Sequence, residues 1–149
     1  MRILILSDSH YKTLDDINFS EFDYVLHAGD YGKSIDTIKQ EGIIFVKGNC
    51  DFEGKNEVEI NINDKNVFIT HGHLYDVKYD FTRLLFKGLS LNANYVIFGH
   101  THEPILFTEQ GVVFINPGAY QDGYYVIADE HKITFYKDNK IIKNFRRKW

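Results

Sequence analysis

Residues 95–102 read YVIFGHTH, an apolar run that ends at Gly99 and is followed by two histidines, His100 and His102. A short apolar run of this kind predicts a buried strand. Glycine lets the backbone turn sharply where such a strand ends. On extended chain, residues two apart share a side. The stretch therefore predicts a strand whose carboxyl end presents two imidazoles together.

The same arrangement recurs four more times along the chain. Apolar runs at residues 2–7, 23–28, 43–47 and 67–70 each lead into Asp, Asn or His, and most have a glycine beside those groups. Ligands of open α/β sheets gather outside the carboxyl ends of parallel strands. We therefore expect parallel strands to bring most of seven side chains to one rim: Asp8, His10, Asp30, Asn49, His71, His100 and His102.

The remaining segments predict the elements that carry these strands. A helix is expected at 33–42 and a weaker one at 11–22, which gives a βαβαβ beginning with parallel strands. Residues 57–70 predict a hairpin with its turn at 63–66, and residues 77–91 predict an amphipathic helix. Runs at 105–109, 112–117, 124–129 and 132–137 resemble an antiparallel meander. The prediction is one α/β domain with two packed sheets and helices outside.

Composition excludes several classes of protein. The net charge of −4 argues against a stable nucleic-acid complex, and the basic segment 140–149 is interpreted as a solvated terminal face. No apolar run is long enough to span a membrane. Cys50 is the single cysteine, which rules out an intramolecular disulfide and fits a reducing compartment. We expect a cytoplasmic protein, and a homodimer by base rate.

The seven clustered groups indicate a metal site. Carboxylates, a carboxamide and imidazoles together suit borderline divalent cations such as Mn, Fe, Zn, Ni or Co. Seven ligands are too many for one tetrahedral ion and suit two ions if one carboxylate bridges. A pair of ions can polarise a phosphoryl group and acidify a water for in-line attack on phosphorus.

The residues that carry this chemistry form five blocks. They are Asp8-Ser9-His10, Gly29-Asp30, Gly48-Asn49-Cys50-Asp51, His71-Gly72-His73 and Gly99-His100-Thr101-His102. In type and order they resemble the five blocks of the calcineurin-like metallophosphoesterases. INPGA, residues 115–119, extends the likeness to the small bacterial and archaeal phosphodiesterase branch, which includes the retromer subunit vacuolar sorting protein 29.

The resemblance implies a fold and a ligand set. It implies a four-layer α/β/β/α sandwich with two mixed sheets and outer helices, in which residues 1–149 form a single metallophosphoesterase domain. One ion would be held by Asp8, His10, Asp30 and His102, and the other by Asp30, Asn49, His71 and His100, with Asp30 bridging. We expect Mn first, with Ni, Fe, Zn or Co as alternatives.

The resemblance also implies an activity, a metal-dependent phosphodiesterase in which a hydroxide bound to two metals attacks a small phosphodiester or nucleotide-like substrate. Asp30, Asn49 and His73 are the expected catalytic residues, with His73 facing either the substrate or the back of a metal ligand. Cys50 and Asp51 are expected to support the ligands. Most of the family has histidine at the position of Cys50, and its absence weakens protonation of an alkoxide leaving group, which favours diesters.

Other functions stay open at this point, as do purely structural roles for single residues. The same fold can serve as a non-catalytic protein-interaction scaffold, although a scaffold is free to lose ligands and all seven are present. A phosphomonoesterase or pyrophosphatase is the third alternative. His27, which lies inside an apolar run, is interpreted as a core residue with its polar atoms satisfied.

Overall fold

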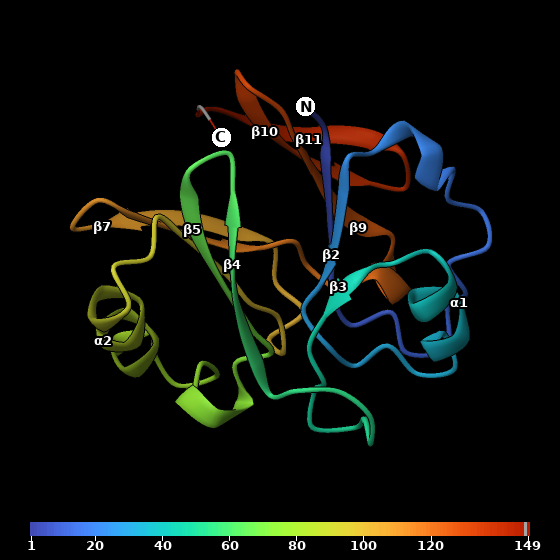
Figure 1. The fold of residues 1–149 in the computed structure, drawn as a ribbon, viewed down its shortest axis with the longest axis horizontal. Helices are drawn as coiled ribbons and strands as arrows, with labels where there is room; N and C mark the ends of the chain where they lie inside the picture. The colour runs from blue at the N-terminus through green and yellow to red at the C-terminus, as the bar shows by residue number, and fades with distance from the viewer. Residues whose placement is uncertain (148) are drawn as a thin grey trace.

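Two β-sheets pack face to face in the computed structural model, which describes residues 1–147 and 149 (Figure 1). The six-stranded sheet has the order β11 (Lys140–Arg146), β10 (Lys132–Lys137), β9 (Tyr124–Ala128), β1 (Ile3–Leu6), β2 (Tyr24–His27) and β3 (Ile44–Phe45). The five-stranded sheet has the order β4 (Glu57–Ile62), β5 (Lys65–Thr70), β6 (Tyr95–Ile97), β8 (Val112–Asn116) and β7 (Ile105–Glu109). The helices are α1 (Ile35–Gln40) and α2 (Thr82–Ser90), with 3₁₀ turns η1 (Phe19–Glu21), η2 (His73–Tyr75) and η3 (Tyr120–Asp122).

Side chains alternate between the two faces of each strand, and this alternation determines which residues fill the layer between the sheets. Ile3, Ile5 and Leu26 point inward from the six-stranded sheet and meet Ile69 and Ile97 of the other sheet. Alternate residues point outward. On one outer face, Leu4 and Leu6 pack with Ile38 of α1. On the other, Phe68 and Val96 pack with Leu84 of α2. The predicted four-layer α/β/β/α sandwich with two mixed sheets and outer helices is confirmed, with α1 and α2 on opposite sides in Figure 1.

Each sheet is mixed: β2 in one and β6 in the other run parallel to both neighbours, whereas β1 pairs antiparallel with β9. β1 pairs in parallel with β2, and β2 with β3. In the other sheet β5 pairs in parallel with β6, and β6 with β8. The predicted parallel beginning of the chain is therefore confirmed, as is the hairpin of β4 and β5. Its turn consists of Asn63 and Asp64, both with positive φ, as a type I′ turn requires.

Two predicted helices differ from the structure. Residues 11–22 contain no α-helix and only the short turn η1, because Asp, Asn and Ser side chains bond locally and compete with helical pairing, as Ser20 Oγ does by donating to Asn18 Oδ1. The helix expected at 77–91 begins only at Thr82. Asp76 adopts a left-handed conformation, and Asp80 Oδ1 accepts a hydrogen bond from the Thr82 amide. Val77 is nevertheless buried, in a turn that precedes the helix.

The C-terminal third is divided between the sheets and is not one meander. β7 and β8 form an antiparallel hairpin in the five-stranded sheet, whereas β9, β10 and β11 form a meander in the other. The basic segment forms the edge strand β11, whose side chains are mostly exposed. Trp149 does not fit the prediction of a solvated face, because its ring is buried and stacks on Tyr95 with centroids 4.0 Å apart. Lys148, also in that segment, lies outside the described residues.

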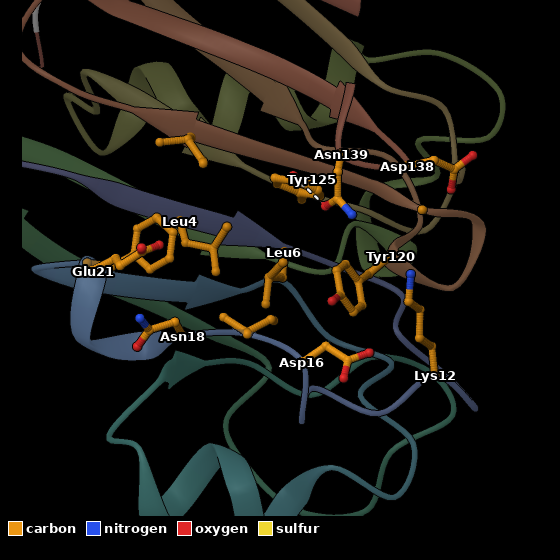
Figure 2. Close-up of a pocket in the computed structure, with 14 residues that line it drawn as sticks. Leu4, Leu6, Lys12, Asp16, Asn18, Glu21, Tyr120, Tyr125, Asp138 and Asn139 are labelled. Carbon is orange, nitrogen blue, oxygen red and sulfur yellow. Dashed lines mark hydrogen bonds between the residues drawn. The ribbon is translucent and has the colours of Figure 1, made fainter. Parts of the chain in front are cut away.

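A cavity of about 360 Å³ opens where the helix at 11–22 is missing. Figure 2 shows Leu4 and Leu6 of β1 on one side and Asp16 and Asn18 of the irregular segment on the other. None of the seven predicted ligands lines this cavity. Among the helices of residues 1–147 and 149, none has the length and apolar character that crossing a membrane requires.

Candidate metal centre

The predicted side chains follow the carboxyl ends of strands from both sheets. Asp8 and His10 come after β1, and Asp30 comes after β2, both strands of the six-stranded sheet. His71 follows β5, and His100 and His102 follow β6, in the five-stranded sheet. The loops are joined across the sandwich by hydrogen bonds, for example from the His100 amide to Asp8 Oδ2 at 3.0 Å.

A left-handed backbone conformation sets the direction of most of these side chains. Positive φ angles occur at five of the predicted ligands, namely Asp8, His10, Asp30, His100 and His102. The expectation that His100 and His102 share a side of extended chain is therefore wrong. Their two turns send the rings to different neighbours, with His100 beside His71 and His102 beside His10. Such conformations cost roughly 1–3 kcal/mol each and persist only when surrounding structure holds them, often at functional sites.

The first group of potential metal ligands is Asp8, His10 and His102, whose ligand atoms all lie within 4.8 Å of one another. Asp8 Oδ1 is 3.2 Å from His102 Nε2 and 3.6 Å from His10 Nε2. Ser7 Oγ and the His100 amide donate to the other carboxylate oxygen, Asp8 Oδ2, at 2.7 and 3.0 Å. One oxygen of Asp8 is thus fixed by the protein, and the other faces the imidazoles.

The second group is Asp30, His71 and His100, with its ligand atoms also within 4.8 Å of one another. The Cys50 amide donates to Asp30 Oδ1, which leaves Asp30 Oδ2 facing His71 Nε2 at 3.2 Å. His71 Nδ1 lies 2.8 Å from the carbonyl oxygen of Ala28. Because a carbonyl only accepts, Nδ1 carries a proton and donates, which orients Nε2 toward the carboxylates.

The electrostatics of the second group favour positive charge. Burial opposes ionisation of Asp30, but the His71 imidazole 3.2 Å away outweighs it and holds the pKa of this carboxyl well below its usual range. Burial likewise disfavours charged His71, yet Asp30 and Asp8 raise the pKa of that imidazole. His100 differs, because burial and the charge of His71 lower its pKa to about 4. A neutral imidazole is the form that binds metal.

Unpaired polar atoms show that these residues fit a cation. Asp8 Oδ1, His10 Nε2 and His71 Nε2 are buried and have no hydrogen-bond partner in the described part of the chain. Asp8 and His71 are themselves fully buried. Buried polar atoms without partners are rare and costly, so a cluster of three that converge requires an explanation. A divalent cation of borderline softness would satisfy all three.

The third predicted block lies in a turn after β3. Asp51 accepts hydrogen bonds from the amides of Asp30 and Gly48 at 2.7 and 2.8 Å, which ties this turn to the loop after β2. Asn49 is exposed, and its amide lies 3.6 Å from Cys50 Sγ. None of the described contacts joins Asn49 to the two groups above. Its role as a ligand stays a prediction.

His73 lies beside the second group, with its ring centroid 5.5 Å from that of His71 and 6.1 Å from that of His100. Burial and the charge of His71 lower the pKa of His73, and Lys47 adds to this effect. His73 Nδ1 is buried without a partner among the described residues. His27 is also buried, but its ring nitrogens contact Ser9 Oγ and the Gly29 amide, so its assignment as a satisfied core residue is confirmed.

Sequence reasoning missed residues that support the site. Ser7 fixes Asp8, and the amide of Asn116 donates to Gly99 O and Thr101 Oγ1 at 3.1 and 3.0 Å, which braces the turn between the two histidines. Asn116 lies in the INPGA stretch, so a signal was present. Lys47 and Lys78 lie near enough to lower the pKa values of His73 and His100. No motif marked these lysines.

Comparisons with known proteins point to one protein family. A family model described as the calcineurin-like phosphoesterase superfamily domain matches residues 1–137. The probable metallophosphoesterase YsnB of Bacillus subtilis is 32% identical over 126 residues, covering 80% of this chain and 75% of that protein. Phosphodiesterase MJ0936 of Methanocaldococcus jannaschii is 32% identical over 145 residues, covering 79% of this chain and 83% of that protein.

Solved structures show the same fold. A predicted phosphoesterase from Streptococcus pneumoniae superposes with a TM-score of 0.83 and 28% identity, covering 98% of this chain and 97% of the other. Vps29 of Entamoeba histolytica, solved with zinc, superposes with a TM-score of 0.78 and covers 99% of both chains. At 23% identity, the likeness to Vps29 concerns the fold alone.

Proposed function

Because the chain belongs to the calcineurin-like phosphoesterase superfamily, we propose that it is a metal-dependent phosphodiesterase that holds two divalent cations, with manganese as the first choice. The observation that carries this proposal is the convergence of three unpaired buried atoms from both sheets, Asp8 Oδ1, His10 Nε2 and His71 Nε2. A relative named as a phosphodiesterase supports the preference for diesters.

The two groups of side chains divide the proposed ligands. Asp8, His10 and His102 would hold one cation, and Asp30, His71 and His100 the other. Asn49 would complete the second set, and Asp30 would be shared. Two such cations, when bound, would supply positive charge to an anionic phosphodiester and lower the pKa of a water.

The chain's own residues then bind and orient the substrate. Lys47 and Lys78 add positive charge beside His73 and His100, which would attract a phosphodiester anion. His73, whose lowered pKa keeps it neutral near pH 7, has a free Nδ1 that can exchange a hydrogen bond with a substrate oxygen. Cys50 lies beside Asp30, and its thiol is a weak acid that would protonate a leaving group poorly. This favours esters whose alcohol leaves without protonation.

The proposal is tested by metal analysis and a hydrolysis screen on one preparation. Protein stripped with chelator and reloaded with Mn should bind two ions and hydrolyse bis(4-nitrophenyl) phosphate faster than 4-nitrophenyl phosphate. Asp8→Asn should lower kcat/KM by more than about 100-fold, because losing a ligand exceeds the loss of a supporting partner. Asp64→Asn, in the turn between β4 and β5, is the matched control and should keep full activity.

Each alternative function has its own outcome in this screen. Faster turnover of the monoester under both Mn and Ni would show a phosphomonoesterase. Metal-loaded protein that hydrolyses neither ester would support an interaction scaffold on this fold. Replacing His73 with Ala should lower turnover while the metal content is unchanged, and unaltered turnover would remove His73 from the mechanism.

A further inference from the structure

Three aromatic side chains in the loops of the metal centre project almost fully into solvent. The exposed fractions of Tyr11, Phe52 and Tyr79 are 91%, 98% and 89%. Tyr11 directly follows His10, and Phe52 directly follows Asp51, so both belong to loops that form the centre. Single exposed rings are common on protein surfaces, but several around one polar site indicate an interaction with a ligand.

The backbone that carries Tyr11 is held on both sides of the ring. The His10 amide donates to Asp30 O at 3.0 Å, and the Lys12 amide donates to Ser9 O at 2.8 Å. Tyr11 thus projects from a segment whose two neighbouring residues are hydrogen-bonded to the rest of the centre.

Phe52 is held in the same way. On one side of it, the Asp51 carboxylate accepts from the Gly48 and Tyr31 amides at 2.8 and 3.2 Å. On the other side, Tyr31 Oη donates to the carbonyl oxygen of Glu53 at 2.6 Å. The turn is therefore fixed by contacts of its polar groups, and these contacts leave the ring of Phe52 outside.

The third ring comes from the other sheet. Tyr79 follows β5 of the five-stranded sheet, whereas the other two rings follow strands of the six-stranded sheet. A Cβ on Gly72, the residue after His71, would approach Val77 Cγ2 at 2.9 Å, so the turn that carries Tyr79 packs against the second group of ligands. The Tyr79 amide donates to Asp76 O at 3.0 Å. Aromatic rings therefore border the centre from both sheets.

Positive charge accompanies the rings. Lys12 follows Tyr11 in the sequence, and Lys78 precedes Tyr79. Lysines next to exposed rings are the combination that binds a phosphate backbone and stacks its bases. The net charge of −4 on the whole chain argues against a long polyanion, so the ligand that these features fit is a short one.

We propose that the substrate is a dinucleotide, whose phosphodiester lies at the metal centre while its two bases stack on the exposed rings. This rests on the proposed phosphodiesterase function and names its substrate class. Tyr11 and Phe52 would stack on one base, and Tyr79 on the other. The oxygen of a water bonds to phosphorus, the P–O bond to one nucleoside breaks, and a proton of the water passes to the departing oxygen. The products are one nucleoside and one nucleoside monophosphate, with no change in oxidation state.

A comparison of two diesters tests whether the bases are recognised. The first is deoxyadenylyl-deoxyadenosine, and the second is its abasic analogue, in which hydrogen replaces both bases. For the Mn-loaded full chain, kcat/KM should be about 100-fold or more higher for the dinucleotide, because each stacked base contributes about tenfold. Both compounds have the same sugars and phosphodiester, so this preference reports the bases alone.

Variants of the rings then locate the contact. Tyr79→Ala should lower the preference for the dinucleotide about tenfold, mainly through KM. Phe52→Leu, which keeps apolar bulk and loses the aromatic face, should also lower it, whereas Phe52→Tyr should retain it. Phe86→Ala is the matched control, because Phe86 is also exposed but belongs to α2 on the outer face of the sheet. Substitutions at such exposed positions are expected to leave the fold intact.

Binding gives a second measurement that does not depend on turnover. The dinucleoside methylphosphonate keeps both bases and resists hydrolysis, so equilibrium dialysis against the Mn-loaded protein measures its Kd directly. Tyr79→Ala should raise this Kd about tenfold, and Phe86→Ala should not change it.

The outcomes separate this inference from the proposed function. If wild type hydrolyses bis(4-nitrophenyl) phosphate but cleaves the dinucleotide no faster than its abasic analogue, the dinucleotide inference is wrong and the phosphodiesterase proposal stands. A preference and a Kd that are unchanged in Tyr79→Ala and Phe52→Leu would also overturn the role of the rings. If the Mn-loaded protein hydrolyses none of these diesters, the proposed function itself fails.

Discussion

The two oxygens of Asp8 have different tasks. Oδ2 accepts hydrogen bonds from Ser7 Oγ and the His100 amide, so Oδ1 is presented to the imidazoles at a fixed angle. Ser7→Ala would remove one of these donors inside the core, where water cannot replace it. We predict a fall in Mn affinity of about 10-fold or more, as for other partners that orient a ligand. Isothermal titration checks this, with Ser90→Ala on exposed α2 as the control. Equal affinity in all three proteins would contradict it.

The buried imidazole of His27 makes the stability of the fold depend on pH. Burial lowers the pKa of His27 to about 3 from its ordinary value of 6.5. Its Nδ1 accepts from the Gly29 amide, so a proton added there would face another donor. Since the folded pKa lies below the unfolded one, the folded state is favoured above pH 6.5, and this stabilisation is lost as pH falls from 6.5 toward 3.

His27→Gln should therefore flatten this part of the pH profile. Between pH 7 and pH 5, the free energy of unfolding of metal-free wild type should drop by about 2 kcal/mol more than that of the variant. Urea denaturation at the two pH values measures the difference. His131→Gln, in an exposed turn, should behave as wild type. Parallel profiles for wild type and His27→Gln would show that this imidazole is not the titrating group.

At the scale of elements, the strand ends must pass each other closely. Gly99 follows β6, and a Cβ at this position would overlap Ser7 Oγ and approach Asp8 Oδ2 at 2.6 Å. Gly99→Ala should thus displace Asp8 and lower Mn affinity by about tenfold or more, with a stability loss of roughly 1–3 kcal/mol from overpacking. Gly42→Ala is the comparison, because open space surrounds that position despite its positive φ. It should lose stability and keep metal binding, and the same pattern in Gly99→Ala would contradict the steric argument.

The strands, and the polar side chains that follow them, could be predicted from the sequence. The conformation of the irregular segments could not. Apolar runs such as Val96–Phe98 are visible in one dimension, and parallel pairing brings their ends together. In contrast, the left-handed conformations of His100 and His102 are imposed by tertiary contacts, including the amide of Asn116. Leu14 anchors residues 11–22 by full burial against the sheet, an interaction that local helical periodicity does not record.

The whole molecule is a sandwich whose two sheets both contribute to the candidate centre. Asp8, His10 and Asp30 follow strands of the six-stranded sheet, and His71, His100 and His102 follow strands of the five-stranded sheet. Away from the centre, the apolar layer between the two sheets holds them together. At the centre itself, carboxylates meet imidazoles with buried atoms left unpaired. A bound cation would therefore connect the two sheets at the end of the sandwich where these strand ends meet.

Metal binding should accordingly stabilise both sheets together. At a free Mn concentration of about 100 times Kd, binding adds about 2.7 kcal/mol, which raises Tm by roughly 5–10 °C in a chain of this size. Amide hydrogen exchange should slow in β2 of one sheet and β5 of the other to similar extents, because opening either sheet breaks the same site. Asp8→Asn should show neither effect, whereas Asp64→Asn should show both. Slower exchange in one sheet alone would mean that the cation is held by that sheet and does not cross-link the sandwich.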